Sequence, residues 1–184
     1  LHLDISPEKS KIINLKQRYS EFLGFKLKVH PKGGKYKVRS HVCDKALVKC
    51  KEKITACVHD IAHPKNDKEQ YAAIQRYNSV VAGLHNYYHI ATCVTPDFDK
   101  IAYAVKRQFR GRIGKELSKA GTLKRGFIKE KYGKSKQLRF LNGHPIIPPG
   151  YVQTKDAQHK KKTVNRYTLE GRAEIHKNLG INTE

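Results

Sequence analysis

The spacing of the apolar residues changes near Ser40, and this change constrains the fold more than any other feature of the sequence. Before it, in the run EFLGFKLKV, side chains alternate with the two-residue period of a strand that has one buried face. After it, apolar residues recur about every 3.6 positions, which is the period of an amphipathic helix. Three segments carry this helical pattern: residues 40–62, 68–92 and 96–119. Because an antiparallel bundle buries three apolar stripes joined by short loops, the sequence predicts a three-helix bundle.

Turn and cap residues set the expected ends of these elements. The Gly-Gly pair at 33–34 can take the positive φ of a tight hairpin turn, so we expect a return strand at residues 36–39. Ser40 is the expected N-cap of the first helix, and Pro64 prevents its continuation. Thr95 is the expected N-cap of the third helix, with a proline at its first position. The predicted fold is mainly α with a small β part: an N-terminal β-hairpin, the helical bundle and a basic C-terminal extension.

The excess of basic residues limits the function most. The chain has 38 Lys and Arg against 16 Asp and Glu, a formal charge of +22. Such a charge repels itself unless a polyanion neutralises it, so nucleic acid is the expected partner. A membrane surface is the weaker alternative, because no apolar run approaches about 18 residues and no signal-like segment is present. Ribosomal proteins carry a similar charge, so the charge indicates a class of partner and not a task.

Three of the four cysteines recur at seven-residue spacing. The cysteines at 43, 50 and 57 share one face of the first predicted helix with Leu47, Ile54 and Ile61. Zinc sites usually contain a CxxC-like pair, which this sequence lacks. We therefore interpret these cysteines as small apolar core residues and predict no metal site in the chain. Free thiols in a core fit a reducing cytosol, so the expected location is cytoplasmic.

The second predicted helix includes the stretch YNSVVAGLHNYYHIATCV, which is apolar over a wide arc yet carries polar side chains. Tyr77, Leu84 and Tyr88 lie on one stripe of this arc, which is typical of a helix packed on two sides. His85 and His89 are four residues apart, as metal-binding pairs are, but the glutamate of an HExxH site is missing. A zinc site stays open as one interpretation. The favoured one places both histidines at the rim of the core, bonded to backbone or RNA.

Catalytic patterns are missing, whereas a nucleic-acid-binding pattern recurs. There is no Gly-rich phosphate loop, no Ser-His-Asp arrangement and no aspartate pair spaced for two metal ions. Asp97 and Asp99 are interpreted as favourable charges at the positive end of the third helix. From that helix onward, Lys and Arg stand beside Tyr, Phe and His, a combination that neutralises phosphates and stacks on bases. The predicted nucleic-acid-binding residues are Lys106, Arg107, Arg110, Arg112, Lys115, Lys119, Lys124, Arg125, Lys129, Lys131, Lys134, Lys136, Arg139, Lys160, Lys161, Lys162 and Arg166.

The last part of the chain shows less regular patterning. In NGHPIIPPGYV, Pro145, Pro148, Pro149 and Gly150 are expected to exclude regular structure, so the segment is predicted to be a linker. A short helix is expected to start near Thr168.

Four motifs occur in a fixed order: SPEKSKI, FLGFKL, YNSVVAGLHNYYHIA and GYVQTKDAQHKKKTVNRYTLEGRAEIHKNL. In this order they resemble the C-terminal part of group II intron-encoded reverse transcriptases, the maturases, over nearly the whole chain. The resemblance implies that residues 1–39 are the end of the palm, residues 40–141 the thumb, or domain X, and residues 142–184 a linker and the start of a basic DNA-binding region. It assigns Phe22, Leu23, Gly24 and Phe25 to the primer-grip turn.

The function implied by the resemblance is that of an RNA-binding region. It would assist splicing of the intron RNA and hold the template-primer duplex during reverse transcription and intron mobility, while its C-terminal region contacts target DNA. In this family the polymerase aspartates, including the YADD-type pair, lie upstream of SPEKSKI, and the chain starts at Leu1 rather than Met. We therefore expect a catalytically inactive piece of a longer RNA-directed DNA polymerase. Mg²⁺ is expected for the full-length polymerase, and no cofactor for this chain.

A rival interpretation has a different class of function. A structural RNA-binding protein of the ribosomal kind would have the same charge and no polymerase upstream. The complete open reading frame separates the two.

Overall fold

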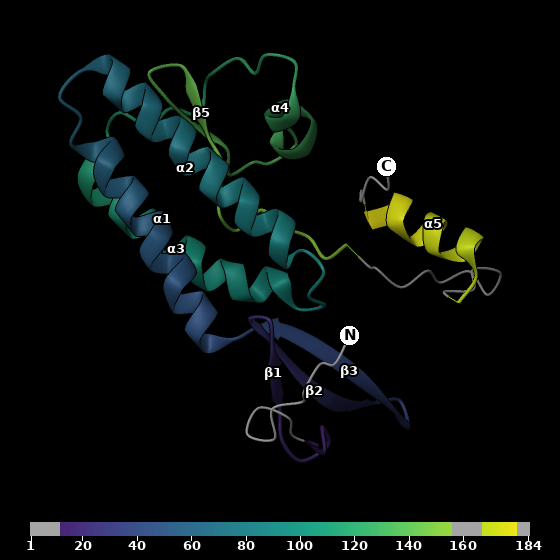
Figure 1. Ribbon diagram of the computed structural model, residues 1–184. Coiled ribbons are helices and arrows are strands. Elements are labelled where there is room, and N and C mark those ends of the chain that lie inside the picture. Colours follow the sequence, from purple (N-terminus) through teal and green to yellow (C-terminus); the bar gives the residue numbers. More distant parts are fainter. Residues whose placement is uncertain (1–11, 156–166, 180–184) are drawn as a thin grey trace, which may run out of the picture.

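The computed structural model describes residues 12–155 and 167–179, which form a mixed α/β structure (Figure 1). Antiparallel strands come first and helices follow, so the expected order of strand and helix is confirmed. In chain order the elements are β1 (Ser20–Phe22), β2 (Phe25–Lys32), β3 (Lys35–Val42), α1 (Asp44–Ala62), α2 (Asp67–Tyr88), α3 (Val94–Ile113), α4 (Phe127–Tyr132), β4 (Arg139–Leu141), β5 (His144–Ile146) and α5 (Leu169–Leu179).

The N-terminal sheet has the order β1-β2-β3, with β2 in the centre. The prediction of one continuous strand through EFLGFKLKV is wrong, because the chain turns between Phe22 and Phe25, which pair with each other. Leu23 and Gly24 both have positive φ, at 49° and 81°, and this conformation suits the two-residue turns that match the twist of a hairpin. The return strand β3 is also longer than the expected four residues, since its pairing with β2 continues to Val42. The apolar run at residues 12–15 forms no strand.

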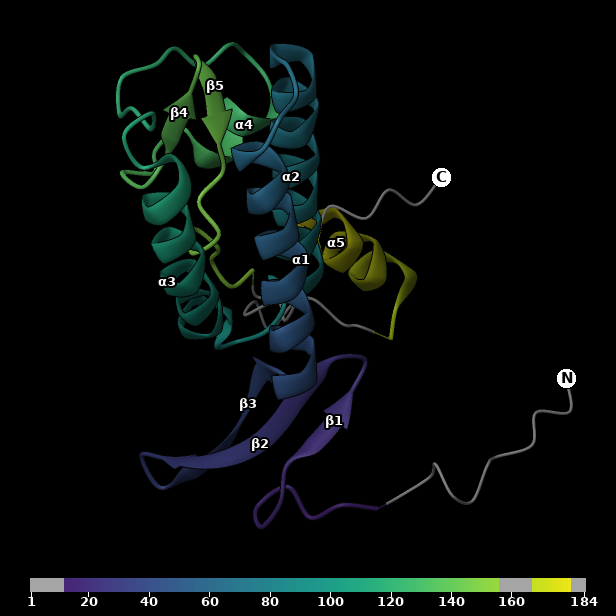
Figure 2. The same ribbon diagram turned by 90° about the vertical axis from the view of Figure 1, so that its left-hand side faces the viewer.

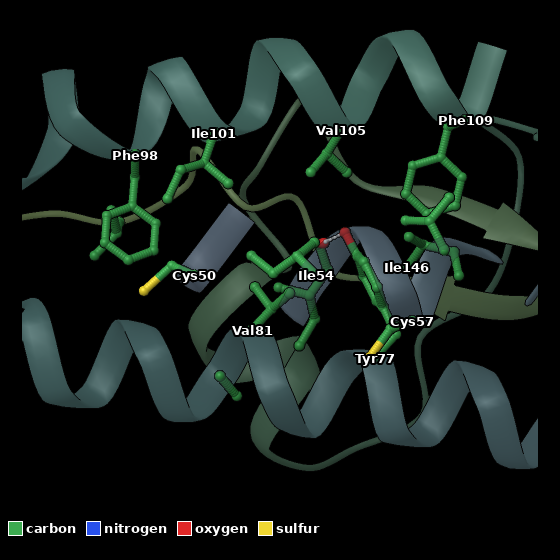
Figure 3. Packing of buried hydrophobic residues seen from close by; sticks show 14 of the residues in the cluster. Cys50, Ile54, Cys57, Tyr77, Val81, Phe98, Ile101, Val105, Phe109 and Ile146 are labelled. Carbon is green, nitrogen blue, oxygen red and sulfur yellow. Dashed lines mark hydrogen bonds between the residues drawn. The ribbon is translucent and has the colours of Figure 1, made fainter. Parts of the chain in front are cut away.

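Helix α1 packs against both α2 and α3, and the apolar stripes of the three helices meet in one core (Figures 1 and 3). Figure 3 shows Phe98, Ile101 and Val105 of α3 pointing toward this core, whose α1 and α2 members include Ile54 and Val81. The prediction that cysteines lie in the core is confirmed for Cys50 and Cys57. Both are buried free thiols, and burial raises the pKa of each thiol.

The first and third helices begin at other residues than predicted. Helix α1 starts at Asp44 because Ser40 is still a member of β3, where its backbone N–H donates to Thr92 Oγ1 at 2.8 Å. Helix α3 starts at Val94, and the Thr95 hydroxyl donates to the carbonyl of Val152 instead of capping the helix. Both predicted caps therefore bond to distant segments.

The proline-rich segment is not an irregular linker. Its residues His144–Ile146 form β5, which pairs with β4 across a turn at Asn142 and Gly143. Pro145 is tolerated because a two-stranded sheet consists of edge strands only. Ile146, Ile147 and Val152 are buried in the core of the helices, so the expected boundary between residues 141 and 142 divides a hairpin that packs as one unit.

No helix among residues 12–155 and 167–179 combines the length and the apolar character needed to cross a membrane.

Replacing Gly83 with alanine should stabilise the protein by about 0.5–1 kcal/mol, because glycine in a helix costs that much relative to alanine. A Cβ added at Gly83 would meet nothing within 4 Å, so the alanine methyl group fits without a clash. Urea denaturation followed by circular dichroism measures the change. Gly24→Ala is the opposite control: φ is +81° and the new Cβ would lie 3.1 Å from the Tyr88 hydroxyl, so this variant should be less stable. A destabilised Gly83→Ala would contradict the exposed position of Gly83.

Candidate nucleic-acid interface

The polar side chains of α2 bind the backbone of the proline-rich segment. Asn78 Nδ2 donates to the Pro145 carbonyl at 2.7 Å, and Asn78 Oδ1 accepts from the Ile147 N–H at 2.9 Å. The Tyr77 hydroxyl donates to the Ile147 carbonyl at 3.0 Å, as the dashed line in Figure 3 marks. Prolines lack an N–H, so a proline-rich segment forms few backbone hydrogen bonds of its own, and its buried carbonyls need donors from elsewhere. Helix α2 supplies these donors.

His85 extends the same contact toward the C-terminal end of α2. Its side chain is fully buried, and burial lowers its pKa to about 4, so the imidazole is neutral at pH 7. Nε2 lies 2.7 Å from the Pro149 carbonyl, which only accepts, so Nε2 carries the proton. Nδ1 therefore accepts from the Tyr132 hydroxyl at 2.9 Å. The prediction of a rim position is wrong for His85, because its side chain is fully buried, whereas the expected bond to backbone is present at the Pro149 carbonyl.

His89 takes no part in this network. It caps α2, its backbone carbonyl accepts from the Lys155 N–H at 2.7 Å, and its buried Nε2 has no hydrogen-bond partner among the described residues. Within the described part of the chain, no three His, Cys, Asp or Glu side chains are grouped so that they could hold a metal ion. The absence of a metal from the whole chain stays a prediction.

A groove of about 650 Å³ lies between α3 and the segment that follows β5. Figure 2 shows the backbone of this segment running beside α3. The bonds from α2 hold that segment along one wall, and α3 forms the other. The floor is apolar, with Phe109, Ile147 and Pro148 among its residues. Four of the predicted nucleic-acid-binding residues line this groove: Lys106, Arg110, Lys119 and Arg139. Basic residues that are far apart in the sequence therefore surround one apolar groove.

The other predicted basic residues lie outside the groove. Arg107 lines a second hollow of about 370 Å³ between α1 and α3, together with Lys51 of α1 and Gln108 of α3. The remaining described ones follow along the end of α3, the loop after it, α4 and the segment between α4 and β4: Arg112, Lys115, Lys124, Arg125, Lys129, Lys131, Lys134 and Lys136. Lys160, Lys161, Lys162 and Arg166 fall outside the described residues.

Carboxylates are scarce around these basic side chains. Residues 106–155 contain 14 Lys and Arg but only two carboxylates, Glu116 and Glu130. The described basic residues of this stretch are exposed except for the half-buried Arg139. None of them forms an ion pair with a carboxylate among residues 12–155 and 167–179. This surface therefore carries a positive field that the described part of the chain leaves uncompensated.

Two of the predicted nucleic-acid-binding residues, Arg139 and Lys131, contact other residues of the protein. The Arg139 guanidinium donates to the carbonyls of Lys136 at 3.0 Å and Leu138 at 2.7 Å, which fixes its position at the groove. Lys131 donates to Asn86 Oδ1 and lies 5.3 Å from the centre of the Phe127 ring. Partial burial, and secondarily the charge of Lys155, lower the pKa of Lys131.

The turn at Phe22–Phe25 is held against the end of α2. The Tyr87 hydroxyl donates to the Leu23 carbonyl at 3.0 Å, and the Phe25 ring contacts both Tyr87 and Tyr88, with centroid distances of 5.7 and 5.4 Å. Phe22 and Leu23 remain 65% and 66% exposed. A rigid turn therefore presents two apolar side chains to the outside.

Asp97 has a structural role beyond the one expected. It lies in the first turn of α3, where a negative charge is favourable, but it is also buried. Its carboxylate accepts from the Val42 N–H at 2.9 Å and contacts His41 Nδ1 at 3.1 Å, which joins α3 to the end of β3. Asp99 instead lines the groove.

The sequence did not reveal the roles of three residues that shape this region. Asn78, which holds the groove wall, lies in a mainly apolar stretch. Asp99 was expected only as a helix-end charge, and Gln137 belongs to no recognisable motif, yet both line the groove. The one available signal was the run of prolines, since their buried carbonyls require donors from outside the segment.

Comparison with known proteins adds no family. No family model matches the chain, and neither the curated proteins nor the solved structures yield a match. The functional interpretation therefore rests on the residues and their arrangement.

Proposed function

We propose that this chain is the thumb and maturase region of a group II intron reverse transcriptase, which binds intron RNA and the template-primer duplex. The motif order supports the family. The observation that carries the binding function is the exposed basic surface of residues 106–155, which forms no ion pair within the described part of the chain. Holding that many like charges on the surface of one fold is unfavourable unless phosphates neutralise them.

Phosphate contacts determine the affinity in this proposal. Each lysine or arginine that neutralises a phosphate releases condensed counterions, so the binding constant falls as salt rises. Preference for the intron comes from RNA shape and unpaired bases, because the deep, narrow groove of an RNA helix hides base edges from side chains.

The turn at Phe22–Phe25 supports the second part of the proposal, contact with a primer strand. Its position is fixed by Tyr87 and by the bond from the Cys43 N–H to the Gly24 carbonyl at 2.8 Å. Exposed Phe22 and Leu23 are then available to pack against the sugar-phosphate backbone of a primer end.

The test is a salt titration of binding to a group II intron RNA and to an unrelated structured RNA of equal length. Wild-type affinity for the intron RNA should fall steeply with salt. A variant with Arg107→Gln, Arg112→Gln and Lys129→Gln should lower the slope of log K against log salt by about 0.7–0.9 for each phosphate that it no longer neutralises. The charge-matched control replaces Lys45, Lys49 and Lys53, which are exposed on α1, with Gln and should leave the slope nearly unchanged.

Two outcomes would contradict the proposal. Binding of the intron RNA that is insensitive to salt would rule out the phosphate contacts. Equal affinity for the two RNAs, together with no acceleration of intron splicing at low Mg²⁺, would favour a structural RNA-binding protein.

A further inference from the structure

We propose that the groove between α3 and the segment after β5 binds a single unstacked nucleotide of the RNA and prefers guanine. This inference rests on the proposed RNA-binding function and names the chemical group that one site takes. The groove combines an apolar floor with a basic rim, and it places a stacking ring and a carboxylate on the same wall.

The side chains of α3 that line the groove are ordered so that they match the parts of a nucleotide. Asp99, Tyr103, Lys106 and Arg110 follow one another at spacings of four, three and four residues, so they form one stripe along the helix, and all four line the groove. At 1.5 Å per residue, Asp99 and Lys106 are about 10 Å apart along the axis. This separation suits a nucleotide whose base edge faces Asp99 and whose phosphate faces the cations.

Tyr103 is the stacking platform. Its side chain is 68% exposed, and it lies on the stripe between the carboxylate and the first cation. Bases stack on exposed aromatic rings in single-stranded complexes with little dependence on base identity. The apolar side chains of Phe109 and Pro148 complete a surface that a base ring can cover.

Asp99 gives the preference. Among the described residues its carboxylate has no hydrogen-bond or ion-pair partner, and it is the only carboxylate that lines the groove in this part of the chain. A carboxylate only accepts hydrogen bonds. Guanine offers two adjacent donors, N1–H and N2–H, whereas adenine and cytosine offer an amino group beside a ring nitrogen that repels the carboxylate. Uracil offers a single N–H between two carbonyls.

Gly150 has no side chain, and this leaves the space beside Asp99 open. A Cβ at this position would lie 3.0 Å from Asp99 Oδ1 and 3.6 Å from Gln137 Oε1. The Gln137 side chain also lacks a hydrogen-bond partner in the described part, so an amide is available beside the carboxylate for the remaining polar atoms of the base.

The experiment measures binding of four fluorescent heptanucleotides, a uridine heptamer and the three versions with G, A or C at the centre. The full chain should bind the G-containing heptamer about 5-fold or more tightly than the others, since a good bidentate base contact discriminates by about 5- to 150-fold. Asp99→Asn should remove this preference, so that the G-containing heptamer binds no more tightly than the other three. Tyr103→Ala should weaken all four by a similar factor of about 5 or more.

Matched controls separate the site from general effects. Asp67→Asn changes the charge equally at the start of α2, and Tyr36→Ala removes an equally exposed ring from β3. Both should bind like the wild type. Because Asp99 and Tyr103 are exposed, their variants should keep the thermal stability of the wild type, which circular dichroism measures.

The outcomes distinguish this proposal from the more general one. Equal affinities for the four heptamers, or no binding of any at protein concentrations that saturate the intron RNA, overturn the guanine site while RNA binding stands. If the wild-type protein binds neither the heptamers nor the intron RNA, the proposed RNA-binding function itself is overturned.

Discussion

Replacing Asn78 with leucine is expected to lower the free energy of unfolding by about 2–6 kcal/mol. Leucine has a similar volume but forms neither of the two bonds to the proline-rich segment, at 2.7 Å to the Pro145 carbonyl and 2.9 Å from the Ile147 N–H. The Pro145 carbonyl and the Ile147 N–H then lack their hydrogen-bond partner in or beside the core. Each unsatisfied buried group costs about 1–3 kcal/mol. Urea denaturation at constant pH, followed by circular dichroism, gives the difference.

The control lies on the same helix. Gln75→Leu places the same side chain at an exposed position of α2 and should change stability by less than about 0.5 kcal/mol. A decrease below about 1 kcal/mol for Asn78→Leu would show that other interactions hold the segment at residues 145–147. Because that segment forms a wall of the groove, the variant should also bind the G-containing heptamer more weakly at temperatures where it is folded.

Stability is expected to fall by about 3 kcal/mol between pH 6.5 and pH 4 because of His85 alone. Burial lowers the pKa of His85 from 6.5 to about 4. As the pH falls below 6.5, the unfolded chain binds a proton at this position while the folded protein does not, so the unfolded state is favoured. The stabilisation is complete above pH 6.5, and it is lost as the pH approaches 4, below which both states are protonated. The difference of about 2.5 pH units corresponds to about 3 kcal/mol.

The measurement is the free energy of unfolding against pH for the wild type and for His85→Gln. The variant is expected to be less stable at pH 7, since glutamine does not reproduce both bonds, but its curve should lack the His85 contribution. The two proteins differ only at position 85, so the difference between the curves isolates the contribution of His85. Parallel curves for the wild type and His85→Gln would contradict a buried neutral imidazole.

The sequence predicted the elements better than it predicted their ends. The three helices and the hairpin at Gly33–Gly34 exist because hydrophobic period and turn chemistry act over a few residues. The expected caps Ser40 and Thr95 failed because each side chain has a partner from another part of the chain. The alternation in EFLGFKLKV indicated a continuous strand, and only the family resemblance placed a turn at Phe22–Phe25, because leucine at positive φ is unusual.

The candidate site was predicted only as a set of charges. The basic residues between Lys106 and Arg139 could be named from the sequence, but not the fact that Lys106, Arg110, Lys119 and Arg139 surround one groove. That grouping depends on how α3 packs against a segment about forty residues later. The assignment to a maturase thumb, the primer grip and the RNA partner remain predictions that binding and splicing experiments test.

The helical and strand periods, the apolar stripes and the positive charge can be recognised in the sequence, because each follows from neighbouring residues or from composition. The roles of the polar side chains of α2 depend instead on tertiary contacts. Asn78 and His85 are seven residues apart on one helix, and either could lie at a solvated rim. They are buried because the proline-rich segment packs against α2, where the carbonyls of the half-buried Pro145 and the buried Pro149 accept from the side-chain N–H groups of α2. These hydrogen bonds join residues more than sixty positions apart. The local periodicity of apolar residues carries no information over that separation.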